Sequence, residues 1–381
     1  MNNDLLRVFE TESDYDSAKP DFVYPTVSYV RDVDEVRYMD ESLRNYFFIE
    51  ALADGMTVTL SNSSQGITAP ANDLEYSTDQ QVWTTLPNNI ASPAINTGER
   101  IYLRGNATSA FDMANMTLGM GFFNISQSCN VGGNIMSLLF NDDFENKTDL
   151  TGYVGAFAGL FTQQPIVDAS ELILPATTLA VNCYWGMFQG CTSLTTAPEL
   201  PATTLEYGCY SGMFRSCTSL TTAPELPATT LADGCYFGMF VSCTSLTTAP
   251  TLPATTLVVD CYRQMFNGCT SLTTAPELPA TTLADYCYYG MFSGCTSLTT
   301  APELPATTLT DWCYTEMFYG CSNLNYITML ATDISASSCL SIWVNGVSAT
   351  GTFVKNPALS EETIGRGVSG IPEGWTVVDA E

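Results

Sequence analysis

The chain has 381 residues, and its 40 acidic and 12 basic residues give a formal net charge of −28. A surface this acidic repels phosphates, so the composition argues against a protein that binds nucleic acid. The chain also contains no histidine, which removes the commonest general base, triad partner and zinc ligand. The composition therefore favours a binding or structural protein over an enzyme, with no cofactor and no metal site.

Residues 1–45 are acidic and interrupted by proline, and such a segment buries little apolar surface by itself. Within it, Val27–Val30 and Val36–Tyr38 predict the two strands of a hairpin. We expect an extended N-terminal arm that is either flexible or ordered against a partner. The first residues carry acids where a secretion signal would carry bases and an apolar core, and no run of about 18 apolar residues predicts a membrane span.

Residues 46–128 contain short strand-like segments divided by Gly, Pro, Asn and Asp. This pattern is typical of a small antiparallel β-sandwich. The expected strands lie within Met56–Leu60, Asp73–Asp79, Gln81–Leu86, Arg100–Gly105 and Leu118–Ser126.

Cysteines then recur with one fixed period. One series runs from Cys183 to Cys339 at intervals of 26 residues, and a second series, from Cys191 to Cys321, follows it eight residues later. An internal repeat of this length is the signature of a solenoid, in which each repeat is one coil stacked on its neighbours. The sequence therefore predicts a solenoid over residues 183–340.

The two ends of the repeat region differ from its middle, and we expect residues 129–182 and 341–381 to cap the solenoid. Cys129–Phe144 predicts a helical cap, and Ala156–Leu179 predicts a degenerate first coil that lacks both cysteines. Residues 341–381 alternate apolar and polar residues around Gly and Pro, which predicts a final coil and a small β closure. Caps are expected because a terminal coil would otherwise expose its core.

Each repeat unit has two unlike halves. In the first half, Cys235, Met239 and Cys243 recur every four residues, which predicts a helix of about two turns with one buried apolar stripe. The second half carries two prolines three residues apart, so it cannot be helical throughout and suits an extended segment and a turn. The expected fold class is therefore a mixed α/β repeat. The inward-pointing side chains of the second half are expected to be Leu246, Leu252 and Leu257.

Four roles compete for the cysteines. Disulfides between neighbouring coils are within reach, but no secretion signal is expected and a fixed period is typical of core positions. The spacing C-x7-C does not match a zinc site, and a reactive thiol needs a basic, partly exposed setting. We therefore predict reduced cysteines that fill a narrow core. The predicted core ladder comprises Cys183, Cys191, Cys209, Cys217, Cys235, Cys243, Cys261, Cys269, Cys287, Cys295, Cys313 and Cys321.

The few positions that vary between repeats indicate where binding would occur. They concentrate around the first half of each unit and are rich in aromatic residues. Aromatic side chains on a rigid array provide contact area at low entropic cost, which favours a binding face. The alternative, that they are half-buried spacers between neighbouring coils, stays open. The predicted face comprises Trp185, Tyr207, Arg215, Phe237, Arg263, Tyr286, Tyr289, Trp312 and Tyr319.

The pattern Leu-Pro followed by C-x3-M-F-x2-C-x2-L resembles the BspA-type leucine-rich repeat, which has A-F-x2-C-x2-L at the same place. Here Met239–Phe240 stands where Ala-Phe is usual, and the unit has 26 residues instead of about 23. The resemblance covers residues 131–340. It implies a leucine-rich-repeat solenoid of a family that serves surface display and binding.

The order of the parts resembles structural proteins of phages that infect Bacteroidales, including crAss-like phages. The resemblance rests on "YPTVSYV" in the arm, "LEYSTDQQVWTTL" in the β domain, the repeats, and the end "GTFVKNP…GIPEGWTVV". It implies a virion structural protein, a head fibre or similar appendage, assembled in the host cytoplasm. The implied partners are a capsid or tail protein for the arm and β domain, a host-surface glycan or protein for the solenoid, and further copies of the chain in a trimer or dimer.

Two other functions remain as alternatives. A bacterial cell-surface adhesin of the BspA type would carry a signal peptide or a lipoprotein cysteine near its N-terminus. An enzyme such as a glycan depolymerase would need a carboxylate pair in a cleft, whereas the acids of the repeats are regularly spaced. We therefore expect a non-enzymatic protein that acts by binding.

Overall fold

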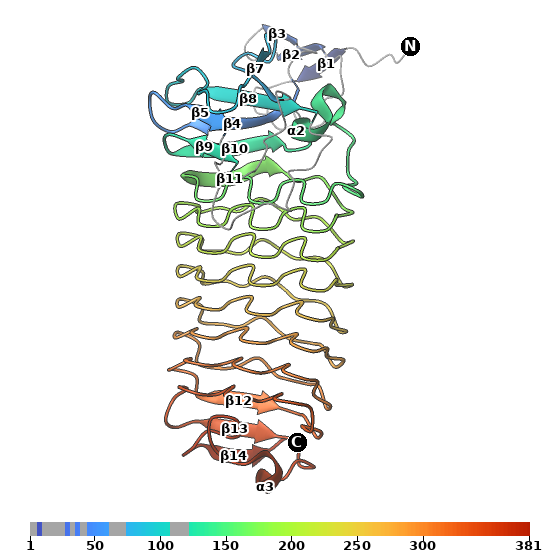
Figure 1. The fold of residues 1–381 in the computed structure, drawn as a ribbon, viewed down its shortest axis with the longest axis vertical. Coiled ribbons are helices and arrows are strands. Elements are labelled where there is room, and N and C mark those ends of the chain that lie inside the picture. Colours follow the sequence, from blue (N-terminus) through green and yellow to red (C-terminus); the bar gives the residue numbers. More distant parts are fainter. Residues whose placement is uncertain (1–5, 10–26, 31–34, 39–43, 61–73, 107–121) are drawn as a thin grey trace.

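The computed structural model describes residues 44–60, 74–106 and 122–381, together with the backbone of three strands among the first 43 residues. These residues form an elongated molecule, with a β-rich body at one end followed by a stack of coils (Figure 1). We call these parts the β domain (residues 44–134) and the repeat stack (residues 149–381). The helices described are all short: α2 (Ser137–Phe140), η3 (Asn141–Asp143) and α3 (Glu361–Ile364).

The N-terminal strands form a three-stranded sheet in the order β1-β2-β3. Its strands are β1 (Leu6–Phe9), β2 (Val27–Val30) and β3 (Glu35–Tyr38). β2 and β3 pair antiparallel with Val27 opposite Tyr38, at the place of the predicted hairpin. β1 adds a parallel strand that the sequence pattern did not predict. Of the rest of the predicted arm, only residues 44 and 45 lie within the described residues.

The β domain contributes β10, β4, β8, β6 and β7 to a six-stranded sheet in the order β11-β10-β4-β8-β6-β7, whose edge strand β11 belongs to the repeat stack, and it has a separate two-stranded sheet of β5 and β9. Phe123 of β9 packs on Phe47 of β4 with their ring centroids 6.2 Å apart, so the small sheet covers one face of the large one. The strands are β4 (Phe47–Ala51), β5 (Val58–Leu60), β6 (Leu74–Ser77), β7 (Thr84–Thr85), β8 (Arg100–Gly105), β9 (Phe123–Ile125), β10 (Cys129–Asn134) and β11 (Ile166–Ile173).

The predicted boundary between residues 128 and 129 is wrong. Cys129–Asn134, predicted as part of a helical cap, is strand β10, which pairs antiparallel with β4 and parallel with β11. Glycine permits this close pairing: Gly133 has a φ of 72°, and a Cβ there would lie 2.0 Å from the Tyr46 carbonyl oxygen. The predicted sandwich is therefore not a closed antiparallel unit, because its mixed sheet includes strands from the predicted cap.

The parallel pairing of β10 with β11 continues as parallel bridges between successive coils of the repeat stack. Asp168 of β11 bridges Thr196 in parallel, and further parallel bridges join later coils, such as Thr222 to Thr248. At the far end, β12 (Tyr326–Met329), β13 (Thr352–Lys355) and β14 (Thr376–Asp379) form a parallel three-stranded sheet. The predicted β closure over residues 341–381 therefore consists of further parallel strands that continue the stack, as Figure 1 shows.

The first half of each coil is not the predicted helix. Every fourth residue has a left-handed backbone, and alternate N–H groups bond within and between coils. The Cys235 N–H donates to the Ala232 carbonyl (3.1 Å), whereas the Tyr236 N–H donates to Cys261 in the next coil (3.1 Å). A helix would bind all of these groups within one coil and leave the stack without inter-coil bonds. The fold is therefore β-rich with tight turns rather than mixed α/β. Around Cys235 the left-handed residues are Gly234, Gly238 and Ser242.

The second half of each coil is extended, as the two prolines predict. Leu246, Leu252 and Leu257 are buried, which confirms their predicted orientation. Inter-coil hydrogen bonds are sparse here, because proline has no N–H to donate. One of them runs from the Thr247 N–H to the Thr221 carbonyl (3.0 Å).

Two ladders of stacked aromatic rings fill the core of the repeat stack. The Tyr236 and Tyr262 rings lie 5.9 Å apart and the Phe240 and Phe266 rings 5.7 Å apart, each pair within 4° of parallel. Such pairs add about 0.5–1.5 kcal/mol each beyond the burial of their area. The tyrosine ladder comprises Tyr184, Tyr210, Tyr236, Tyr262, Tyr288 and Tyr314, and the phenylalanine ladder Phe188, Phe214, Phe240, Phe266, Phe292 and Phe318.

The ladders connect the two ends of the molecule. Phe161 packs against Phe47 of the β domain (5.7 Å) and against the first ring of the phenylalanine ladder. Both ladders end on the buried Trp343, whose indole Nε1 donates to the Gly370 carbonyl (2.9 Å). One hydrophobic core therefore extends from Tyr46 to Trp375.

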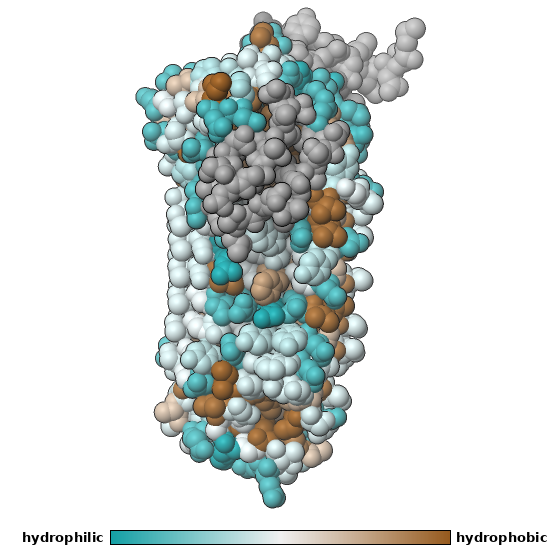
Figure 2. Space-filling model, in the orientation of Figure 1, coloured by the Kyte–Doolittle hydropathy of each residue, from teal (hydrophilic) through white to brown (hydrophobic). Residues whose placement is uncertain are grey.

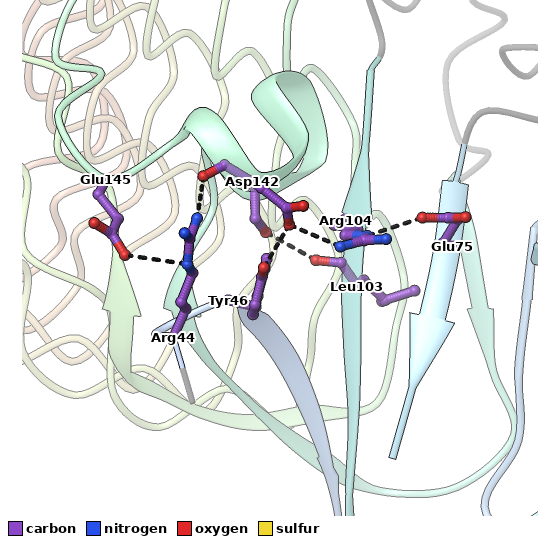
Figure 3. A network of polar contacts seen from close by, with 8 residues as sticks. Arg44, Tyr46, Glu75, Leu103, Arg104, Asp142 and Glu145 are labelled. Carbon is purple, nitrogen blue, oxygen red and sulfur yellow. Dashed lines mark hydrogen bonds and ion pairs between the residues drawn. The ribbon is translucent and has the colours of Figure 1, made fainter. Parts of the chain in front are cut away.

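A polar network lies where the β domain meets α2 and η3 (Figure 3). The Asp142 carboxylate accepts hydrogen bonds from the Tyr46 hydroxyl and from Arg104 Nη1 (2.7 Å). Arg104 also contacts Glu75 (2.8 Å), and Arg44 lies 3.8 Å from Glu145. Burial, together with the neighbouring Asp142 carboxylate, raises the pKa of Tyr46 to about 12. These partners satisfy one another, which indicates a structural junction rather than a reactive site.

Candidate functional site

The nine predicted face residues are half-buried or exposed, and they occupy the outward positions of the turns. The inward positions carry the Cys-Tyr and Met-Phe pairs of the core. Tyr207 is 58% exposed and Tyr319 43%, and Arg215 is also exposed. Figure 2 shows apolar residues in several separate spots along the stack, between neutral and hydrophilic residues.

Arg263 lies at the centre of an aromatic cluster. Its guanidinium carbon is 4.7 Å from the ring centroid of Tyr289, 5.4 Å from Tyr286 and 5.5 Å from Phe237. Each of these distances is within the range of a cation–π contact. Arg263 Nη1 also lies 3.2 Å from Asp260 Oδ1. Three coils thus supply side chains to one charged and aromatic centre.

The cluster continues toward the C-terminal coils. Tyr286 stacks on Trp312 with ring centroids 5.8 Å apart and planes within 6°. The Tyr289 hydroxyl donates to Glu316 Oε1 (3.0 Å), and burial together with this carboxylate raises the pKa of Tyr289.

Toward the N-terminal coils the cluster opens into a groove of about 490 Å³, lined by Trp185, Tyr207, Phe237 and Arg263. Gly208 and Gly234 line the groove at a position where later coils carry Tyr286 and Trp312. We call the following seven residues the aromatic face: Trp185, Tyr207, Phe237, Arg263, Tyr286, Tyr289 and Trp312.

Two residues of the aromatic face hold unfavourable backbone conformations. Tyr286 and Trp312 have φ values of 59° and 60°. A left-handed conformation costs a residue with a Cβ about 1–2 kcal/mol relative to glycine, and such strain persists mainly at functional sites. The equivalent Gly234 avoids this cost. The presence of aromatic residues at the other two positions, despite the cost, indicates that their side chains have a function at the surface.

Arg215 and Tyr319 lie outside the aromatic face. Both are exposed on the same flank of the coils, four residues beyond the positions of Ser211 and Thr315. Within the described part of the chain, neither side chain makes an ion pair or ring contact. The structure therefore brings seven of the nine predicted residues together and leaves these two apart.

Sequence patterns alone did not indicate Asn182, Asp233, Asp260 and Glu316. The first three line the groove, and Glu316 binds Tyr289. Asn182, Asp260 and Glu316 have a left-handed backbone conformation, and they stand at repeat positions where other coils often carry glycine. A residue other than glycine at such a position is the signal that would have identified these three.

The structure buries all twelve cysteines of the predicted ladder as free thiols. Those of the second series also donate hydrogen bonds: Cys217 Sγ lies 3.1 Å from the Phe188 carbonyl oxygen, and Cys243 Sγ 3.0 Å from that of Phe214. Burial raises the pKa of Cys243 to about 12. These thiols lack the thiolate character that nucleophilic attack or metal binding requires.

The native protein is expected to resist thiol labelling near neutral pH. An alkylating reagent should modify few cysteines in hours without denaturant, and all fourteen once urea unfolds the chain, because the thiols are buried and protonated. Mass spectrometry of the intact protein counts the adducts. Rapid modification of the native protein would contradict the core assignment.

The described residues 44–60, 74–106 and 122–381 offer no metal site. No group of three or more Cys, Asp or Glu side chains there is placed to hold a metal ion. The exposed Glu225 carboxylate accepts a hydrogen bond from Thr251 Oγ1 (2.9 Å). None of the helices that the structure describes has the length and apolar character to cross a bilayer. Comparison with protein-family models, curated proteins and solved structures finds no match.

Proposed function

We propose that this chain is a virion structural protein, a head fibre or similar appendage, whose BspA-type leucine-rich-repeat solenoid binds a host-surface glycan or protein. The observation that supports binding best is the cluster around Arg263, with three aromatic rings against one guanidinium on an outward flank. Aromatic residues and arginine are the side chains that most often dominate binding energy at interfaces. The chain acts in this proposal by attachment and not by catalysis.

The scaffold suits display. Constant residues fill the continuous core, whereas the aromatic face lies at positions that vary from coil to coil. A stack that buries one core along its whole length holds its outer side chains in fixed relative positions, and this lowers the entropic cost of binding.

The placement in a virion rests on the resemblance of the whole arrangement to phage structural proteins. Reduced, buried thiols are compatible with assembly in a cytoplasm. The N-terminal arm and the β domain are proposed to contact a capsid or tail protein, which leaves the repeat stack to meet the host. Several copies in a trimer or dimer would turn weak contacts into useful avidity.

The alternative is a BspA-type adhesin on a bacterial surface. Mass spectrometry of purified virions and of host cell envelopes separates the two placements. We expect the chain in intact particles at a fixed ratio to the major capsid protein. Its presence in envelopes of uninfected cells and absence from particles would overturn the virion placement and support the adhesin.

A further inference from the structure

We infer that the groove between Trp185 and Arg263 binds a neutral polysaccharide, a ligand class that deepens the proposed attachment function and rests on it. The groove is lined from successive coils, by Trp185, Tyr207, Phe237 and Arg263 among others. Its volume of about 490 Å³ is that of a small-molecule site. Because it crosses several coils, it fits a run of sugars better than one residue.

The aromatic rings of the groove suit the apolar faces of sugars. Trp185 and Phe237 are half-buried, so part of each ring remains open, and Tyr207 is 58% exposed. Pyranose rings carry patches of C–H groups that pack on aromatic faces, and rigid rings provide this contact at a low entropic cost.

The polar groups of the groove suit sugar hydroxyls. Asp233 and Asp260 offer carboxylate acceptors, Arg263 offers donors, and Asn182 offers both. A hydroxyl group donates one hydrogen bond and accepts others, so it can bind to both kinds of group at once. Arg263 Nε is buried and has no acceptor among the described residues, so the Nη groups of this side chain are the donors that a ligand in the groove could reach.

The charge of the groove argues against an anionic ligand. The Arg263 guanidinium is paired with Asp260, whereas the Asp233 carboxylate is exposed and makes no ion pair with the described residues. With a net charge of −28 on the whole chain, the potential repels uronates, sialates and phosphates. A cationic ligand would compete with Arg263 for the faces of Phe237, Tyr286 and Tyr289. A neutral glycan is neither repelled by the negative charge nor in competition with Arg263 for the aromatic rings.

The decisive variant is Gly234→Tyr, which fills the groove. Tyr286 and Trp312 already stand at the equivalent position with φ values of 59° and 60°, and Gly234 has a φ of 60°. A Cβ at Gly234 would meet its nearest neighbour, Tyr207 Cε2, at 3.9 Å, which is an ordinary contact. Trp185→Ala is a second variant that removes one ring, and Tyr319→Ala is the matched control on the same flank outside the groove.

Affinity electrophoresis through dextran, mannan, galactan, polygalacturonate or chitosan oligomers tests the inference on the full chain. We expect at least one neutral polysaccharide to retard the protein at both low and high salt. Gly234→Tyr and Trp185→Ala should each weaken this binding at least tenfold, and Tyr319→Ala should leave it within twofold. Circular dichroism and urea unfolding establish that each variant is folded.

The inference is overturned if no neutral polysaccharide binds, if only the charged polymers bind, or if both groove variants bind as tightly as the wild type. If host cells bind the labelled wild-type chain but no neutral polysaccharide does, the ligand is not a neutral polysaccharide, and the proposed attachment function is still supported. Cells and polysaccharides that both fail to bind the chain would count against attachment itself.

Discussion

Raising the pH from about 8 to about 11 is expected to unfold the protein, because its buried thiols keep their protons only in the folded state. Burial raises the pKa of Cys209, Cys243 and Cys261 from 9.0 to about 12. Below the unfolded value both states are protonated, and pH has no effect through these groups. Above it, only the unfolded chain releases the proton, so the free energy of unfolding falls as the pH rises toward the folded value.

The size of this effect follows from the number of buried thiols. Each one lowers the free energy of unfolding by at most about 1.4 kcal/mol per pH unit, and all fourteen cysteines are buried. Burial also raises the pKa of the ladder tyrosines Tyr184 and Tyr210, which acts in the same direction above their unfolded value. Together, several such groups lower the free energy of unfolding by more than a typical stability of about 5–15 kcal/mol within two to three pH units.

Urea unfolding followed by circular dichroism, in reducing buffer between about pH 7 and about pH 11, measures this dependence. The midpoint should hold up to about pH 8 and then fall steeply. The double variant Cys217→Ala, Cys243→Ala is the matched control. Its free energy of unfolding should fall less steeply with pH, by the equivalent of up to two protons released on unfolding. A wild-type midpoint that stays constant across the range would contradict the burial of the thiols.

Phe240→Ala is expected to cost about 3–5 kcal/mol, the usual penalty for removing a large aromatic side chain from a close-packed core. The Phe240 ring is fully buried and stacks between Phe214 and Phe266, with a centroid distance of 5.7 Å to each. The deletion therefore leaves a cavity in the middle of the ladder and removes two ring contacts.

Urea unfolding at neutral pH tests this prediction, with Tyr319→Ala as the control. Tyr319 is 43% exposed, so its truncation should change the free energy of unfolding by less than about 0.5 kcal/mol. Equal shifts in the two variants would show that the phenylalanine ladder contributes no more than a surface residue.

The 26-residue period and the inward leucines were readable from the sequence, because equivalent residues of stacked coils share one environment. The tight turns of the first half of each coil were not readable. A spacing of four residues places Cys235, Met239 and Cys243 on one side of a helix, and it does the same in a chain of successive four-residue turns. Glycine at both Gly234 and Gly238 distinguishes the two, since glycine disfavours a helix and accepts a left-handed turn. Likewise, a tyrosine after every first cysteine from Cys183 to Cys313 is the signal for the second aromatic ladder.

The shared sheet and the aromatic face depend on contacts that are distant in sequence. β10 is glycine-rich, and its pairing with β4 joins residues about eighty positions apart, such as Val131 and Ile49. A local pattern carries no record of such a pairing. The composition of the aromatic face was predicted, but the central place of Arg263 follows from which coils are neighbours, and so does the separation of Arg215.

Binding of the fluorescently labelled chain to Bacteroidales cells, the host that the proposed virion placement implies, tests attachment through the aromatic face most directly when Arg263→Ala and Arg215→Ala are compared. The two variants remove the same charge from the same flank, but only Arg263 contacts Phe237, Tyr286 and Tyr289. We expect Arg263→Ala to weaken cell binding at least about tenfold, the equivalent of about 1.4 kcal/mol, and Arg215→Ala to bind like the wild type. Equal binding by the two variants would contradict the account.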